Sequence, residues 1–308
     1  MYFSVRRGPA SIHHKDENMQ ITDHIHAIRI PFRLEFSPEK SVERFVYAFM
    51  VFDNQITLID SGVSGSEQLI FDYIRTNGRH PDEIGMLVLS HSHPDHIGSA
   101  KSIKAETGCT VLAHKAEKAW IEDTDLQFKE RPVPGFHKLV GGPVLLDRLL
   151  AEGQRLDLGG PVSCEVLHTP GHSAGSISLF FRGEKALFSG DALILPGELP
   201  IYDDIRTCVA SMKRLRKVSD VEVLISSWEA PMKGREAIMS RIDEGIRYLQ
   251  KIHQTVLEVH QSEAADPMEL CQSVVKALGL PMIAVNPIVA KAFASSLTSR
   301  IDDMVFDQ

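Results

Sequence analysis

The chain has no long apolar run, and this absence excludes one class of protein. A membrane-spanning helix needs about 20 consecutive apolar residues, and no segment of the 308 residues approaches that length. The sequence from Met1 to Pro9 contains two arginines but no apolar stretch after them, so a secretory signal is not expected. We therefore expect a protein without a membrane partner.

Cysteine is scarce as well. The four cysteines are widely spaced, form no Cys-x-x-Cys pair and each lie in an apolar run: Cys109, Cys164, Cys208 and Cys271. We interpret them as buried small apolar residues. Reduced thiols and the missing signal sequence together predict a cytoplasmic protein.

Positive charge is in deficit. The net charge is −8 at pH 7, which argues against a polyanion such as RNA as the main partner. Apolar residues make up 43% of the chain and charged residues 24%, as in ordinary globular proteins. The length allows one large domain or two smaller ones around a substantial core. The composition is consistent with an enzyme whose partner is a small-molecule substrate.

A dense group of ligand-type residues stands out against this background. The sequence from His91 to His96 reads His-Ser-His-Pro-Asp-His and follows the apolar run from Met86 to Leu89, where a buried strand should end. Imidazole is the commonest metal ligand among side chains, and with a carboxylate it suits zinc, iron or manganese better than calcium or magnesium. His91 and His93 point to one side if the chain stays extended. Asp95 and His96 then fall at the start of a helix expected near Ile97. A chance histidine cluster in a polar loop is the alternative.

Two later loops offer further ligands. His172 lies in a Pro-Gly-His turn between two apolar segments, and Asp191 follows the strand-like run from Ala186 to Gly190. Loops that follow strands are where a sheet scaffold usually presents functional side chains.

In this order the motifs resemble the metallo-β-lactamase superfamily, whose signature is a His-x-His-x-Asp-His loop, a later Pro-Gly-His turn and a Gly-Asp step. The stretch Leu58–Gly62 is similar to the family's early strand ending in Asp-x-Gly, and Ser211–Leu215 to one of its helices. The resemblance covers about residues 20 to 235. It implies an α/β fold, a four-layer αβ/βα sandwich, with the metal ions at one edge between the sheets.

The resemblance also implies the ligand sets. His91, His93 and His172 would make one metal position, with Asp191 bridging to a second that includes Asp95 and His96. Asp60 is expected to hydrogen-bond behind these ligands, and His168 is a further candidate for that role.

The chain departs from the family's pattern at the last metal ligand. The strand from Val221 to Ile225 runs into Ser-Ser-Trp-Glu, so that Trp228 takes the place of the final metal-binding histidine. An indole nitrogen is only a donor. Glu229 next to it, or His137 from an inserted loop, is a candidate replacement. Zinc is the expected cofactor, with one or two ions bound, and iron or manganese remain alternatives.

The expected activity follows from such a centre. A zinc-type ion lowers the pKa of a bound water from 15.7 to about 7, which makes hydroxide available, and polarises the substrate oxygen. Asp95 would orient this water and carry its proton to the leaving group. The main hypothesis is a metal-dependent hydrolase of a small ester, thioester or lactone.

Two other activities stay open. Some relatives use a single iron, held by two histidines and one aspartate, as sulfur dioxygenases. His91, His172 and Asp191 would provide that set here. A phosphodiesterase is the other alternative, although the acidic composition of the chain makes this activity less favoured than hydrolysis of a small ester, thioester or lactone. A scaffold that binds metal weakly and no longer catalyses is the least favoured.

The chain is divided by pattern into three parts. Residues 1–19 read as a polar extension and 20–233 as the catalytic domain, with an insertion at about 115–155 that we expect to cover the site. Residues 234–308 read as a helical appendage, because apolar residues recur every three or four positions from Ile238 to Val259. Its apolar stripe is expected to pack on its own domain, and a homodimer contact is the alternative. Helices are also expected from Glu67 to Thr76 and from Ile97 to Thr107.

Overall fold

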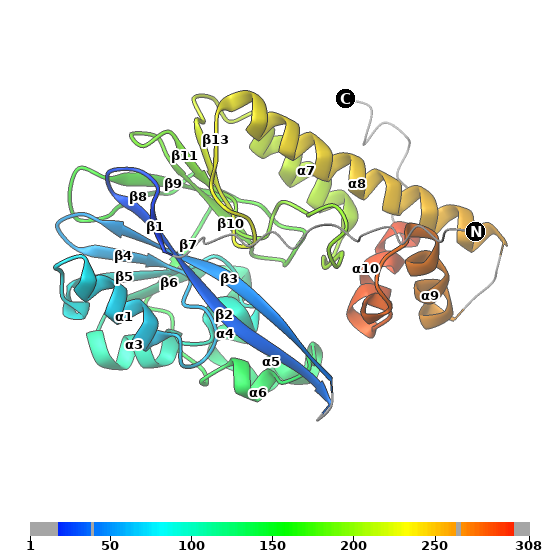
Figure 1. Cartoon of the computed structure of the whole chain (residues 1–308), viewed down its shortest axis with the longest axis horizontal. Coiled ribbons are helices and arrows are strands. Elements are labelled where there is room, and N and C mark those ends of the chain that lie inside the picture. The colour runs from blue at the N-terminus through cyan, green and yellow to red at the C-terminus, as the bar shows by residue number, and fades with distance from the viewer. Residues whose placement is uncertain (1–17, 38–39, 263–265, 299–308) are drawn as a thin grey trace, which may run out of the picture.

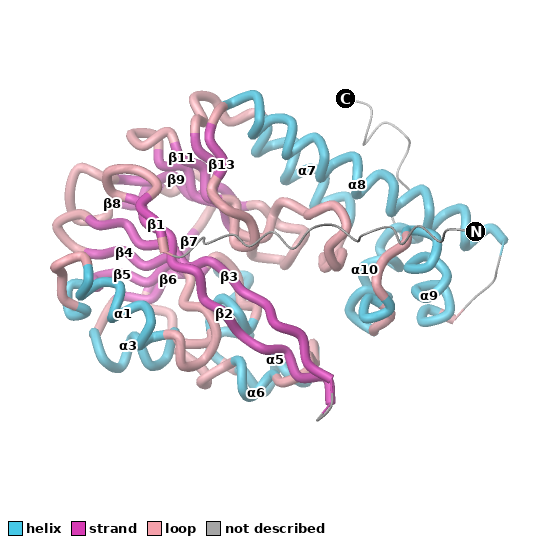
Figure 2. The backbone as a smooth tube through the Cα atoms, in the orientation of Figure 1, coloured by secondary structure: helices cyan, strands magenta, loops and turns pink. Residues whose placement is uncertain are grey.

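The computed structural model describes residues 18–37, 40–262 and 266–298. Two sheets face each other at the centre (Figures 1 and 2). The seven-stranded sheet has the order β1-β2-β3-β4-β5-β6-β7, and the six-stranded sheet has the order β13-β12-β11-β10-β9-β8. The strands are β1 Met19–Gln20, β2 Ile25–Ser37, β3 Lys40–Phe52, β4 Ile56–Ile59, β5 Ile84–Leu89, β6 Thr110–His114, β7 Arg148–Leu150, β8 Arg155–Asp157, β9 Ser163–His168, β10 Ile177–Phe181, β11 Ala186–Phe188, β12 Val223–Ile225 and β13 Met232–Lys233.

Helices cover the outer face of each sheet, which confirms the four-layer α/β fold (Figure 1). The helices are α1 Glu67–Thr76, η1 Pro81–Glu83, α2 Pro94–Ile97, α3 Ala100–Thr107, η2 Lys115–Glu117, α4 Lys118–Glu122, α5 Thr124–Glu130, α6 Phe136–Leu139, α7 Ile205–Arg216, α8 Arg235–Ser262, α9 Pro267–Leu278, η3 Met282–Ala284 and α10 Pro287–Thr298. Among the described helices, none combines the length and apolar character needed to cross a membrane.

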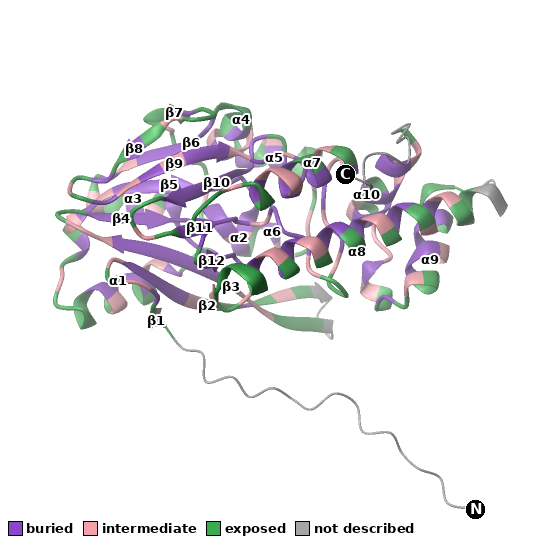
Figure 3. Ribbon diagram, turned by 90° about the horizontal axis from the view of Figure 1, so that it is seen from above, coloured by how far each residue is buried: buried purple, intermediate pink, exposed green. Residues whose placement is uncertain are grey.

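The core lies between the sheets and beneath the helices, as the buried strands in Figure 3 show. Phe49 of β3 packs against Phe188 of β11 across the two sheets, with ring centroids 5.4 Å apart. Both side chains are fully buried. Fully burying a side chain of this kind stabilises the fold by about 1.5–3 kcal/mol.

The parallel parts of the sheets determine where the functional loops meet. β4, β5, β6 and β7 are parallel neighbours in one sheet, and β11 and β12 are parallel in the other. Parallel strands end at the same edge of a sheet, and the crevice outside their carboxyl ends is the usual ligand site of open α/β sheets. Asp60 follows β4 and His91 follows β5, whereas Asp191 and Trp228 follow β11 and β12. Loops distant in sequence therefore converge on one edge.

The helix expected from Ile97 to Thr107 is two helices, α2 and α3, which is a correction. Gly98 lies at the break, where its N–H donates to the Gly62 carbonyl oxygen at 2.8 Å. A Cβ at this position would lie 2.3 Å from the Leu139 carbonyl oxygen and 2.5 Å from the Ser64 nitrogen. The close approach of these two loops thus requires glycine, and it ends α2 directly after the signature.

The segment at 115–155 is helical only in its first half. Four short helices, from η2 to α6, are followed by β7, which pairs with β6 and extends the seven-stranded sheet. In the C-terminal part, α8 packs along α7, and α9 and α10 pack against α8. Apolar side chains of these helices form one buried cluster with those of β11 and β12.

Candidate metal centre

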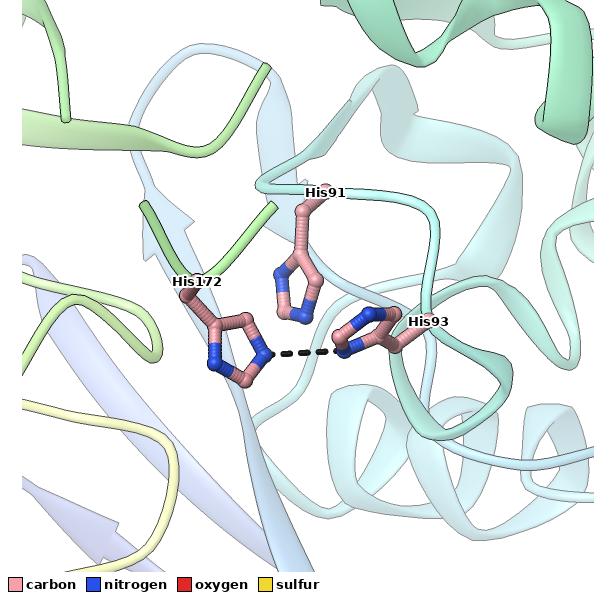
Figure 4. Close-up of side chains that lie close together, drawn as sticks. All are labelled: His91, His93 and His172. Carbon is pink, nitrogen blue, oxygen red and sulfur yellow. Dashed lines mark hydrogen bonds between the residues drawn. The ribbon is translucent and has the colours of Figure 1, made fainter. Parts of the chain in front are cut away.

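Three imidazoles meet at the shared edge of the two sheets (Figure 4). His91 and His93 lie in the loop after β5, and His172 lies in the turn between β9 and β10. The His172 Nε2 atom is 2.8 Å from the His93 Nδ1 atom. One nitrogen of each ring lies within 4.8 Å of the others, and all three rings are buried. The structure therefore brings together the three residues predicted for the first metal position.

Hydrogen bonds to the outer nitrogens define which ring nitrogens face the centre. His172 Nδ1 donates to the Ile201 carbonyl oxygen at 2.8 Å. The Ser90 hydroxyl donates to Asp60 and so accepts from His91 Nδ1, at 2.9 Å. Both rings therefore carry their proton on Nδ1 and turn the Nε2 lone pair inward, as metal ligation requires.

A second group of ligand atoms shares His91 with the first. It consists of His91, His96 and Asp191. His96 Nε2 is 3.5 Å from Asp191 Oδ1, and His172 Nε2 is 3.4 Å from Asp191 Oδ2. Asp191 thus lies between the two groups, where the family resemblance expects a bridging carboxylate.

Three inward atoms are buried and unpaired, which tests whether these residues fit a metal ion. Among the described residues, His91 Nε2, His96 Nε2 and Asp191 Oδ1 have no hydrogen-bond partner. Buried polar atoms are rarely left without one, and such a group costs about 1–3 kcal/mol. Two of them belong to the segment that follows β5 and the third follows β11. Together they fit a metal ion of the imidazole- and carboxylate-binding kind.

Burial keeps two of the imidazoles in the neutral form that ligates metals. It lowers the pKa of His91 well below the usual value, and the neighbouring His96 adds to this effect. Burial also lowers the pKa of His93 well below its usual value, and the positive charge of Arg131 lowers it further. The pKa of His172 is lowered by burial too, against the opposing charge of Asp191.

His96 lies in the opposite electrostatic environment. Burial lowers its pKa, but the carboxylates of Asp191, Asp95 and Asp60 outweigh burial and hold the pKa well above its usual value. The carboxylates around the His96 ring therefore favour a positive charge there, supplied either by a proton on the ring or by a metal ion.

Asp60 anchors the loop of the signature from behind. Its carboxylate accepts from the Ser90 N–H and hydroxyl, each at 2.7 Å, and from His96 Nδ1 at 2.8 Å. Its backbone has a φ of 61°, in the left-handed region that aspartate tolerates better than most residues. Asp60 therefore has the contacts expected of a residue that orients the ligands.

Asp95 lies beside His96, with Oδ2 at 3.6 Å from Nε2. Burial raises the pKa of Asp95, and the charge of Asp191 raises it further against the opposing effect of His96. It is not one of the residues in the two groups of converging ligand atoms. The structure places it at the edge of the centre, beside His96.

Trp228 lies at the centre but contributes a donor. Its indole N–H donates to Asp191 Oδ2 at 2.9 Å. The ring is enclosed by Phe32 and Phe45, with centroids 6.4 Å away in each case, and the Arg44 guanidinium lies 4.9 Å from its ring centre. The indole thus donates to the Asp191 carboxylate at the position where the family resemblance implies a metal-binding histidine.

Two candidate replacements for that histidine lie elsewhere. The Glu229 carboxylate accepts from Arg241 of α8, with both oxygens 2.9 Å from Nε. His137 is exposed on α6 and packs against Phe128 and Phe136. Neither belongs to a group of converging ligand atoms within the described part of the chain.

His168 is also set back from the ligands. Its ring stacks on His114 with centroids 4.1 Å apart, and its Nε2 bonds the Ala174 carbonyl oxygen at 3.0 Å. It therefore contacts the turn that carries His172 rather than a ligand.

Glu117 is a functional candidate that the sequence did not reveal. This buried carboxylate accepts from the N–H and hydroxyl of Ser92, from the Ser173 hydroxyl at 2.7 Å and from the Gly175 N–H at 2.5 Å. Ser92 lies between His91 and His93, whereas Ser173 follows His172. One carboxylate of the insertion thus ties together the two loops that carry the three imidazoles.

The family of the chain follows from comparison with known sequences. Residues 42–240 match the metallo-beta-lactamase superfamily, which is more than half of the chain. The chain belongs to this superfamily. Its members bind divalent metal ions, and the imidazole–carboxylate cluster is the candidate site for one here.

Curated relatives are similar to part of the chain. A probable metallo-hydrolase, YqgX, from Bacillus subtilis is 33% identical over 48% of this chain and 66% of its own length. Acyl-coenzyme A thioesterase MBLAC2 from Gallus gallus is 33% identical over 48% of this chain and 59% of its own. A hydroxyacylglutathione hydrolase from Methylococcus capsulatus is 30% identical over 37% of this chain and 36% of its own length. The chain thus spans less than two thirds of the length of each.

Solved structures agree with the fold. A beta-lactamase domain protein from Burkholderia ambifaria superposes with a TM-score of 0.65 at 17% identity, covering 91% of this chain and 88% of that one. At this identity the similarity shows the fold alone.

Proposed function

We propose that this chain is a metal-dependent hydrolase of thioesters, with small esters and lactones as related substrates. The observation that carries the proposal is the convergence of His91, His93 and His172, each buried, with Asp191 beside them. Three imidazoles leave one coordination position of a tetrahedral ion open, as catalytic zinc sites require. Zinc is the proposed ion.

The bound ion would supply a water of lowered pKa and polarise the carbonyl oxygen of the substrate. The protein's own residues perform the remaining tasks. Asp60 and Ser90 orient His91 and His96 through their outer nitrogens. Asp95, whose pKa is raised by burial, accepts a proton and returns it to the leaving group.

The choice of thioesters rests on the relatives. One is named an acyl-coenzyme A thioesterase and another a hydroxyacylglutathione hydrolase. Both names describe an acyl group on a thiol. A thiol is also a better leaving group than an alcohol, because its pKa is about 8.5.

The test is a screen of the zinc-loaded protein against matched thioester, ester, lactone and phosphodiester substrates. We expect thioesters to give the highest kcat/KM, measured by thiol release. Preferential turnover of the phosphodiester, or no turnover of any substrate by fully loaded protein, would contradict the proposal.

One observation favours a second activity. His91, His172 and Asp191 form a two-histidine, one-carboxylate set, with Asp191 Oδ2 3.9 and 3.4 Å from the two Nε2 atoms. Such sets hold the single iron of some oxygenases. Metal analysis with an oxygen electrode separates the two. Iron in the purified protein and thiol-dependent oxygen uptake would support the sulfur dioxygenase, whereas zinc without oxygen uptake would support the hydrolase.

A further inference from the structure

A cavity of about 490 Å³ lies between the C-terminal helices and the loop that follows Asp191. Its wall is formed by residues 196–197 of that loop, by one face of α8 between positions 244 and 251, and by residues 278–280 at the end of α9. α9 packs against α8 (Figure 1). A volume of this size suits a small ligand. The C-terminal helices thus form part of a ligand-sized cavity.

A series of side-chain contacts leads from this cavity to the candidate metal centre. The Tyr248 hydroxyl, in the cavity wall, donates to the Glu198 carbonyl oxygen at 3.3 Å. The Glu198 carboxylate accepts from Arg44 of β3 at 3.0 Å, and the Arg44 guanidinium lies 4.9 Å from the centre of the Trp228 ring. Trp228 donates to Asp191 at 2.9 Å. The cavity therefore lies on the side of the centre where Trp228 is found.

The backbone limits the separation of the two sites. Pro196 in the cavity wall follows Asp191 by five positions, so that their Cα atoms are at most about 18 Å apart. The Ile194 carbonyl oxygen, between them, accepts from Arg241 of α8 at 3.3 Å. Arg241 and Tyr248 are seven positions apart and share one face of α8, so that α8 holds the loop at two points. A long ligand bound at the centre can therefore reach the cavity.

Two cations in the cavity wall indicate the charge of the ligand. Arg247 and Lys251 are four positions apart, and like charges at this spacing repel each other on a helix. Among the described residues neither forms an ion pair, whereas Arg216 and Arg241, beside and on the same helix, each pair with a carboxylate. The wall also contains the carboxylate of Glu244 against these two cations. An anion between the cations would remove their repulsion.

The other part of the wall suits a flat apolar group. It includes Pro196, Tyr248, Leu278 and Leu280, of which Leu280 is buried and Tyr248 and Leu278 are partly buried. Bases stack on aromatic side chains because every base has a π-face. Apolar walls with a few well-placed polar groups are typical of small-molecule sites. The apolar wall and the two cations together match a nucleotide that carries phosphates.

We propose that this cavity binds the nucleotide of a coenzyme A thioester, with its phosphates on Arg247 and Lys251. The inference rests on the proposed thioester hydrolysis, because the nucleotide and the scissile bond belong to one substrate. The pantetheine arm between them has about the length of four extended residues, roughly 14 Å, which is comparable with the separation of the two sites. Arginine offers a phosphate two parallel hydrogen bonds, and lysine adds a point charge. The cavity thus selects coenzyme A over shorter thiols such as glutathione.

Solvation of α8 is the competing explanation. Arg247 and Lys251 are exposed, and as ordinary surface cations they would affect substrates with and without a nucleotide equally. Arg235 provides the matched comparison, because it is an exposed cation of the same helix outside the cavity wall. Substrate selectivity, rather than overall activity, therefore separates the two explanations.

The first experiment compares the unmodified zinc-loaded chain with a double variant, Arg247→Gln with Lys251→Gln, at one low ionic strength. The substrates carry the same acyl group on coenzyme A or on pantetheine, which lacks the nucleotide. We expect kcat/KM for the coenzyme A thioester to fall about 10- to 100-fold, mainly through KM, as for loss of a hydrogen bond to a charged group. Acyl-pantetheine hydrolysis should be unchanged, and Arg235→Gln should change neither substrate. An equal fall for both substrates, or no fall, would overturn the proposal.

A binding measurement separates this inference from the proposed function. Adenosine 3′,5′-bisphosphate, which has no thiol and no acyl group, is titrated calorimetrically into the zinc-loaded chain, the double variant and Arg235→Gln. We expect about 10-fold weaker binding by the double variant alone, even if no thioester is hydrolysed. Inorganic phosphate should bind the unmodified chain more weakly than the nucleotide, because it lacks the base. No nucleotide binding, equal binding by all three proteins, or phosphate binding as tight as that of the nucleotide would overturn the nucleotide site and leave the hydrolase proposal intact.

Discussion

The Trp228 indole N–H donates to Asp191 Oδ2 at 2.9 Å, so that an aromatic donor binds the carboxylate that lies between the two groups of ligand atoms. The same oxygen is 3.4 Å from His172 Nε2 and 3.9 Å from His91 Nε2. An indole cannot ligate a metal ion in the ordinary way. Trp228 therefore adds no ligand atom to either group, and we expect the position around His96 to bind metal more weakly than the one formed by His91, His93 and His172.

We expect Trp228→His to raise the bound metal from about one toward two ions per chain, because it would add the imidazole that a second position lacks. The measurement is metal content after dialysis against limiting zinc. Trp228→Phe is the matched control, since it keeps an aromatic ring against Phe32 and Phe45 but cannot ligate. Two fully bound ions in the unmodified chain would contradict this account.

We expect His172→Ala to abolish metal retention and hydrolysis together. The change removes one imidazole from the group of His91, His93 and His172, and two remaining imidazoles should bind zinc far more weakly. His168→Ala is the control, because His168 lies four positions before His172 but stacks on His114 instead. Full metal content and turnover in His172→Ala would show that the first position is assigned wrongly.

Asp95→Asn should leave the fold intact and slow the reaction by about 10²- to 10⁴-fold, the usual range for loss of a general acid or base. The loss should be larger for an ester than for its thioester, because an alcohol needs the returned proton more than a thiol does. Steady-state kinetics on the matched pair and the thermal unfolding midpoint are measured together. Near-normal turnover of both substrates would remove Asp95 from the mechanism.

Much of this site could be predicted because its ligands lie in short local motifs. The signature loop, the Pro-Gly-His turn and the Gly-Asp step each follow an apolar run that ends at the same edge of the sheets. The C-terminal helix was predictable for a similar reason, since its apolar spacing from Ile238 to Val259 is local and regular. In each case neighbouring residues alone define the element.

The remaining features depend on contacts between distant segments. Glu117 meets Ser92 and Ser173, which are 25 and 56 positions away, and no local pattern marks it. Glu229 was a candidate ligand from its neighbourhood in sequence, but Arg241 of α8 pairs with it. The break at Gly98 likewise follows from the approach of the Ser64 and Leu139 backbones.

Glu117→Gln should destabilise the chain by about 1–3 kcal/mol, because the amide group would meet donors such as the Gly175 N–H and leave a buried donor unpaired. Loss of such a supporting contact should also weaken zinc binding by about 10- to 100-fold. Urea unfolding and competition with a chelator measure the two effects. Glu106→Gln, an exposed position of α3, is the control. Unchanged zinc affinity in Glu117→Gln would show that this carboxylate does not position the ligand loops.

The most direct test of the central claim is anomalous scattering from crystals of the full chain loaded with zinc. The account predicts one strong peak at the zinc absorption edge, between His91, His93 and His172, and a weak peak or none between His96 and Asp191. The account would be contradicted by the absence of a peak at the three imidazoles, or by two equal peaks at limiting zinc.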